Sequence, residues 1–164
     1  MTRLIIALFV AMFALSACDT GGTGPKGEGI FKIRAGETGK IQFRMLDSIN
    51  ALRQASGLEK VELSAALTAA AATHSRDMSV QNRPWHFGSD GSSPIERVAR
   101  AGYQGTMLGE AISETFESDV ETLGDWMSND ETRNVILDSR ALFMGISWFQ
   151  EVNGKIWWTL IVGS

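Results

Sequence analysis

Cysteine is almost absent from this chain, since Cys18 is the only one among 164 residues. A single cysteine excludes an internal disulfide and leaves no further thiol for catalysis or metal binding. Basic charge is also scarce, because 15 Lys and Arg residues stand against 19 Asp and Glu, for a net charge of −4. An acidic chain without a basic patch argues against nucleic acid or anionic lipid as a main partner.

The chain also lacks an apolar run long enough to span a membrane. Leu4 to Leu15 is apolar and uncharged and follows Arg3, but a spanning helix needs about 20 such residues. A short apolar run after a basic residue is typical of a secretory signal peptide. We therefore expect residues 1–17 to be cleaved, and the loss of Arg3 takes the net charge to −5.

The segment Leu15-Ser16-Ala17-Cys18 resembles the bacterial lipobox. The resemblance implies that a diacylglycerol is attached to Cys18, which then becomes the N-terminus. Each buried CH₂ of an acyl chain contributes about 0.8 kcal/mol, so several chains give durable anchoring. The prediction is an exported protein, lipid-anchored in the bacterial envelope and facing the periplasm or the cell surface.

After the anchor, composition separates a tether from a domain. Residues 18–40 are Gly-rich and contain Pro25, which is typical of a flexible linker. Residues 41–164 contain no internal repeat and have the size of one domain. Apolar spacing and turn residues within them predict, in order, a helix around 45–52, an Ala-rich helix over 64–81, an ordered loop over 84–94, a helix over 95–101, a strand over 106–113 and a helix over 118–127.

The last part of the domain predicts the fold class. Residues 142–149 and 156–162 read as two strands joined at Asn153-Gly154, and apolar or small residues occupy both faces of each strand. A hairpin that is apolar on both faces must be covered on both. We expect an α+β fold, a three-layer α-β-α sandwich around a central, mainly antiparallel sheet.

A series of short motifs, taken in order, resembles the CAP superfamily, which includes cysteine-rich secretory proteins, plant pathogenesis-related proteins and bacterial SCP-like proteins. The resemblance covers Leu46 to Gly163. Its pieces are Asn50-Ala51-Leu52-Arg53 with Gly57-Leu58, Ala70-Ala71 through Asp77-Met78, His86-Phe87-Gly88-Ser89-Asp90-Gly91, Arg97 through Gly102-Tyr103, Gly109-Glu110-Ala111-Ile112, Trp126-Met127, Arg133 through Leu137, and Trp158-Thr159. The family fold is the same α-β-α sandwich that the hairpin predicts.

The resemblance implies a central cleft lined by two histidines and one or two acidic residues, which binds a divalent metal in some members. His86 stands at the first family histidine and Glu110 at the family glutamate. The asparagine that usually follows the glutamate is Ala111, and the second histidine is Thr132. The binding cleft implied by the family therefore comprises His86 and Glu110, with Trp85 at its mouth and Asp130, Glu131 and Thr132 beside it.

Metal binding at this cleft needs more ligands than His86 and Glu110, because zinc takes three or four. Asp130 or Glu131 would supply a third if its side chain turned inward, and such an oxygen-rich site would suit a weakly held, harder cation. The alternative is that both acids simply begin the helix after Asn129, where the helix dipole favours negative charge. No metal or other cofactor is assigned.

The same two residues carry the functional hypotheses. His86 beside Glu110 forms either an acid–base pair or a structural contact, but the chain has no thiol to spare and no Gly-x-Ser-x-Gly elbow. His74 shares a helical stripe with Leu67 and Met78, which predicts a half-buried packing role rather than a ligand role.

We therefore expect a non-enzymatic binding module for a cell-wall, lipid or protein ligand, with His86 and Glu110 as the candidates for any catalysis or metal binding. The alternatives are a hydrolase of envelope polymer or peptide that uses these two residues, with or without a metal, and a purely structural envelope protein.

Overall fold

The structure, a computed structural model, describes residues 31–115 and 117–164. The predicted signal peptide and Cys18 lie outside the described residues, as does most of the predicted tether. In the part of the chain that is described, no helix has the length and apolar character needed to cross a membrane.

A four-stranded sheet forms the middle of the domain, in the order β1-β3-β4-β2. The strands are β1 (Glu62–Leu63), β2 (Met107–Thr115), β3 (Phe143–Gln150) and β4 (Ile156–Gly163). β3 and β4 form the predicted hairpin, β2 pairs antiparallel with β4, and β1 pairs parallel with β3. The sheet is therefore mainly antiparallel, as predicted.

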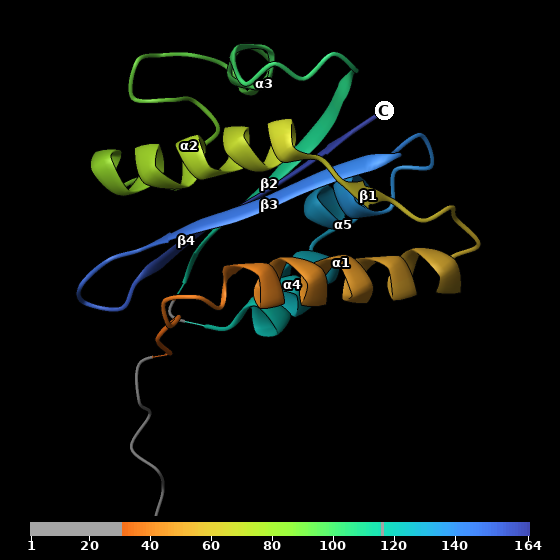
Figure 1. Ribbon diagram of the computed structural model, residues 1–164, viewed down its shortest axis with the longest axis horizontal. Helices are drawn as coiled ribbons and strands as arrows, with labels where there is room; N and C mark the ends of the chain where they lie inside the picture. The colour runs from red at the N-terminus through yellow and green to blue at the C-terminus, as the bar shows by residue number, and fades with distance from the viewer. Residues whose placement is uncertain (1–30, 116) are drawn as a thin grey trace, which may run out of the picture.

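Helices cover both faces of this sheet (Figure 1). On one face lie α2 (Ala65–Gln81) and α3 (Pro94–Arg100), and on the other lie α1 (Thr38–Ala55), α4 (Asp119–Ser128) and α5 (Asp130–Ile136). Two separate clusters of buried apolar side chains fill the spaces between the layers. The three-layer sandwich predicted from the sequence is confirmed.

The returning strand of the hairpin explains why both layers are needed. Every residue of β4 is buried. Trp158 belongs to the larger cluster under α1, α4 and α5, whereas Ile161 belongs to the smaller cluster under α2 and α3. Gly154, with φ +96°, makes the turn between the strands in a conformation that other residues rarely adopt.

Local capping sets the helix starts that matter for the site. Ser93 and Glu96 form a capping box at the start of α3, and Ser118 and Glu121 form another at α4, the latter as the sequence predicts. At its other end, α2 stops at Asn82, whose φ of 48° turns the chain into the loop that precedes α3. The capping residues thus fix where the 82–93 loop begins and ends.

An ion pair joins α1 to the start of α4. The two guanidinium nitrogens Nε and Nη2 of Arg44 each donate to one carboxylate oxygen of Asp119, both at 2.7 Å. Asp119 is fully buried, whereas Arg44 is half-exposed. Both oxygens of the buried carboxylate are therefore bonded by one arginine that remains in contact with water.

The folded part begins before the predicted boundary at residue 41. Phe31 and Ile33 pack against the larger apolar cluster. The Gln150 side chain accepts from the Ile33 amide and donates to the Phe31 carbonyl, and α1 starts at Thr38. Residues 31–40 are therefore held to the sheet by apolar burial and by Gln150, although their glycines favour a tether in the sequence.

Candidate functional site

Glu110 lies at the centre of the site because of the register of β2. Its neighbours Gly109 and Ala111 face the α4 and α5 side, where Gly109 lies against Val135 and Ala111 joins the larger cluster. Side chains alternate along a strand, so Glu110 points to the other face, under α2 and α3. Its side chain is only 2% exposed there.

Arg97 neutralises this buried carboxylate, and His86 forms a hydrogen bond with it. Arg97 Nη2 donates to Glu110 Oε2 at 2.7 Å, and His86 Nδ1 lies 2.9 Å from Oε1, where its proton donates to the carboxylate. Arg97 Nη2 also lies 3.3 Å from the His86 carbonyl oxygen. α3, whose start is set by Ser93, supplies the arginine, and the 82–93 loop supplies the histidine, so Glu110 ties both to the sheet.

His74 completes the cluster from the inner face of α2. It is fully buried rather than half-buried, and its Nε2 lies 3.6 Å from Glu110 Oε1. Within the described residues neither ring nitrogen has a hydrogen-bond partner. Burial lowers the pKa of His74, with Arg97 acting in the same direction and Glu110 opposing it. The imidazole is therefore held neutral at physiological pH.

The exposed part of the site is the loop around His86. The His86 side chain is 50% exposed. Beside it, the Trp85 and Phe87 rings lie 5.5 Å apart, and the Arg83 guanidinium lies 4.0 Å above the Trp85 ring. Trp85 Nε1 donates to Gln81 at the end of α2, which fixes the indole. His86 thus stands between two aromatic residues in a loop at the surface.

The three predicted cleft residues of α5 make local contacts at the start of that helix. Asn129 caps α5 by accepting from the Glu131 amide, and the Thr132 hydroxyl donates to the Trp126 carbonyl. Asp130, whose side chain is 82% exposed, pairs with Arg133. In the described part of the chain, none of the hydrogen bonds or ion pairs of these three residues reaches His86 or Glu110.

The donor set around Glu110 does not fit a divalent cation. Across the described ranges, no group of three or more His, Cys, Asp and Glu side chains has metal-binding geometry. The positive charge of Arg97 lies 2.7 Å from Glu110 Oε2, where it already neutralises the carboxylate and would repel a cation. Glu110 therefore acts as the partner of an arginine in this arrangement.

Sequence reasoning paired His86 with Glu110 but left Arg97 and His74 out of the site. Arg97 entered only as part of a family motif, and His74 only as a residue on an apolar stripe. Their position beside Glu110 follows from the register of β2 against β4, where Glu110 pairs with Ile161. The feature that could have identified these two residues is their place on the helices: Arg97 on α3 and His74 on α2 are each a titratable side chain on the inner face of the same helical layer.

The family model of the cysteine-rich secretory protein (CAP) family matches residues 46–162. The chain belongs to this family. The match includes every residue of the Glu110 cluster and all four strands except Gly163, the final residue of β4. The CAP domain thus accounts for nearly all of the described structure.

Other proteins resemble this chain in sequence or in fold. The uncharacterized protein YkwD of Bacillus subtilis (strain 168) is 25% identical over 120 residues, which is 73% of this chain and 46% of that protein. The structure of an extracellular protein with an SCP domain from Bacillus anthracis superposes with a TM-score of 0.69 at 18% identity, over 77% of this chain and 41% of that one. The chain thus spans less than half of the length of either protein.

A third solved structure matches over most of both chains. The structure of an outer surface protein of Borrelia burgdorferi superposes with a TM-score of 0.66 at 15% identity, covering 82% of this chain and 97% of that one. At these identities the superpositions establish the fold alone. They agree with the three-layer arrangement seen here.

Proposed function

We propose that this CAP domain is an envelope-anchored, non-enzymatic binding module that recognises cell-wall polymer through His86. The main support for the proposal is that both carboxylate oxygens of Glu110 are already hydrogen-bonded inside the protein, one to Arg97 and one to His86. A carboxylate that is 2% exposed and already paired has no free position from which to activate a water molecule.

His86 is the member of the cluster that meets a ligand. Its Nδ1 bonds to Glu110, which fixes the tautomer and leaves Nε2 as the acceptor. The rings of Trp85 and Phe87 come from the residues on either side of it in the chain. A sugar ring offers hydroxyl donors for Nε2 and an apolar face for the aromatic side chains, so wall glycan suits this surface.

Location also supports a wall ligand. The predicted signal peptide and the predicted lipid on Cys18 would hold the domain in the envelope. Two of the proteins that share the fold are an extracellular protein and an outer surface protein. Export is therefore a property of those relatives, and we extend it to this chain as part of the proposal.

The proposal is tested by mixing a soluble chain, residues 19–164, with isolated cell-wall sacculi and measuring both the pelleted protein and the released fragments. We expect pelleting without release, and His86→Ala should reduce pelleting at least five-fold while its melting temperature stays well above the assay temperature. Gln54→Ala is the matched control, because Gln54 is exposed on α1, on the other face of the sheet. This control should pellet like the wild type.

Two outcomes would overturn the proposal. Fragment release that disappears with His86→Ala would identify a hydrolase, the alternative that the sequence left open. Equal recovery of the same protein partners from wild type and from a His86→Ala, Glu110→Ala double variant, together with no pelleting, would indicate a purely structural envelope protein.

The anchor is tested separately. Cys18→Ser should abolish incorporation of labelled fatty acid and move the protein from the membrane fraction to the soluble fraction. Retention of the label, or of membrane association after cleavage, would show that Cys18 is not the lipidated residue.

A further inference from the structure

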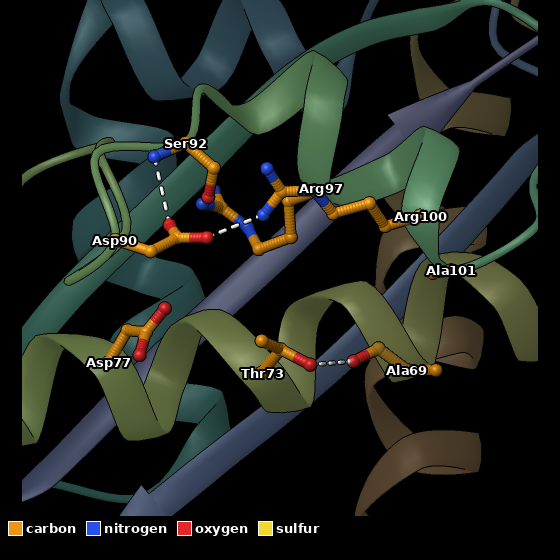
Figure 2. A pocket seen from close by; sticks show the side chains of 8 residues that line it. All are labelled: Ala69, Thr73, Asp77, Asp90, Ser92, Arg97, Arg100 and Ala101. Atoms are coloured by element: carbon orange, nitrogen blue, oxygen red, sulfur yellow. Dashed lines mark hydrogen bonds and ion pairs between the residues drawn. The ribbon is translucent and has the colours of Figure 1, made fainter.

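A pocket of about 210 Å³ lies between α2 and α3, on the outer side of the helical layer and apart from the exposed loop residues Trp85 and His86. Figure 2 shows its walls: Thr73 and Asp77 come from α2, Asp90 and Ser92 from the loop, and the two arginines from α3. Four charged side chains, Asp77, Asp90, Arg97 and Arg100, line it. The proposed function does not use this pocket, although Asp77 and Asp90 stand in the family motifs and Arg97 also bonds Glu110.

One end of the pocket has unused hydrogen-bond donors. Arg97 is almost completely buried, and only its Nη2 is engaged, by Glu110 and the His86 carbonyl. Within the described residues its Nε and Nη1 have no acceptor. Buried guanidinium N–H groups without an acceptor are unfavourable. An acceptor group of a ligand that reached these two nitrogens would satisfy them.

The other end of the pocket has one carboxylate without a counter-charge among the described residues, that of Asp77. Asp77 accepts from the Ser89 hydroxyl, and among the described residues it forms no ion pair with a cation. A Cβ atom built on Gly88 would lie 2.7 Å from Ser92 Oγ, 2.8 Å from Asp90 Oδ1 and 3.1 Å from Asp77 Oδ2. Three oxygens therefore converge where the loop passes α2. Because Asp90 already pairs with Arg100, the uncompensated negative charge is that of Asp77.

We propose that this pocket binds a small zwitterion of the amino-acid type, with its ammonium group at Asp77 and its carboxylate at Arg97. Unpartnered N–H donors at one end and an uncompensated carboxylate at the other suit the carboxylate and the ammonium group of such a ligand. The volume corresponds to about seven water molecules at roughly 30 Å³ each, which is the size of a single amino acid. The pocket and the His86 surface share only Arg97, so this inference stands apart from wall binding.

The ligand could be a free amino acid or the amino and carboxylate end of a larger molecule, and the experiment separates the two sources. The protein purified from membranes in detergent is titrated calorimetrically with a panel of free D- and L-amino acids, with their N-acetyl and amide derivatives, and with dipeptides. We expect at least one free amino acid to bind with a submillimolar Kd. Acetylation and amidation should each weaken that binding at least ten-fold. Tighter binding of a dipeptide would indicate the end of a larger molecule.

Variants on the exposed side of α2 test the location. Ala69→Phe places a ring in the pocket and should abolish binding. Ala72→Phe is the matched control, because Ala72 is exposed on the same helix but does not line the pocket. It should bind like the wild type. Asp77→Asn keeps an acceptor for Ser89 but removes the charge, and should weaken binding at least ten-fold.

The inference is overturned if no amino acid or dipeptide saturates the protein, if the blocked derivatives bind as well as the free ones, or if Ala69→Phe binds normally. Melting temperatures confirm that each variant is folded. Pelleting with sacculi is measured on the same variants, and we expect Ala69→Phe to pellet like the wild type. A loss of pelleting in His86→Ala alone would therefore report on the proposed function and not on this pocket.

Discussion

Among the described residues each helical layer holds one buried carboxylate paired with an arginine, and the two pairs differ in what they leave unsatisfied. Between α1 and α4, both oxygens of Asp119 are bonded by Arg44, which is itself half-exposed. Under α2 and α3, Glu110 takes one bond from Arg97 and one from His86, while two nitrogens of Arg97 have no partner among the described residues. The first pair is complete, because both of its carboxylate oxygens are hydrogen-bonded within the fold. The arginine of the second pair still has N–H donors to offer, as expected of a ligand-binding site.

The largest effect should come from the layer that contains the complete pair. Trp158→Ala removes a fully buried ring whose centroid lies 5.1 Å from that of Trp148 within the larger apolar cluster. A cavity of this size should lower the free energy of unfolding by about 3–5 kcal/mol, measured by urea titration. Wall pelleting of the folded variant should not change. A denaturant midpoint close to that of the wild type would contradict the packing of the two-sided sheet.

A direct comparison of the two pairs should give the next largest effect. Glu110→Gln leaves the buried Arg97 without a counter-charge and should cost about 3 kcal/mol of stability. Asp119→Asn should cost less, about 1 kcal/mol, because the half-exposed Arg44 can return to water. Urea titration of both variants measures the difference. Equal losses would show that the two pairs are equivalent and that burial of Arg97 does not set the site apart.

Helix caps allow a matched test with a smaller effect. Ser93→Ala and Ser118→Ala each remove a capping box, at α3 and α4 respectively. Each should cost about 1 kcal/mol. Only Ser93→Ala should also weaken pelleting with sacculi, because α3 holds Arg97 against Glu110 and His86. Equal pelleting by the two variants would mean that the position of α3 does not govern the exposed histidine.

The smallest expected effect is the pH dependence of stability that comes from one group, His74. Burial holds the pKa of His74 below its ordinary value of 6.5. As the pH falls below 6.5, the unfolded chain therefore takes up the proton before the folded one does, and stability is lost. The slope from this one group cannot exceed about 1.4 kcal/mol per pH unit.

His74→Leu tests this assignment. Urea titrations of wild type and variant between pH 8 and pH 5 should show a difference in stability that changes below pH 6.5 and is constant above it. Parallel curves over the whole range would show that His74 does not titrate as its burial requires.

The fold was predictable from the sequence because the hairpin has an unusual pattern. Two strands that are apolar on both faces leave few alternatives to a covered sheet, and the Ser118–Glu121 box marks a helix start without reference to the rest of the chain. β1 was not predicted, because Glu62–Leu63 is too short to show an alternation. The early start of the fold was missed because its packing depends on Gln150, 117 residues away from Ile33.

The site was predictable only where a motif pointed to it. His86 and Glu110 stand in family motifs, and the structure places them 2.9 Å apart. His74 and Arg97 carry ordinary helical patterns, and their role depends on which face of β2 Glu110 occupies. Asp130, Glu131 and Thr132 were included because of their motif position, but their local contacts are those of a helix start.

Gln150 fastens Phe31 and Ile33 beside the hairpin turn, and under the proposed lipid anchor it would also limit how far the domain extends from the membrane. With a lipid on Cys18, about 13 residues separate the anchor from Phe31, and a fully extended chain of that length spans at most about 45 Å. Glu110 pairs with Ile161, about five residues along β4 from Ile156, which adds roughly 17 Å. Under the proposed anchor and wall ligand, a wall strand more than about 60 Å from the anchoring leaflet would be beyond the reach of His86, and the length of the linker would set which layer of the envelope the protein contacts.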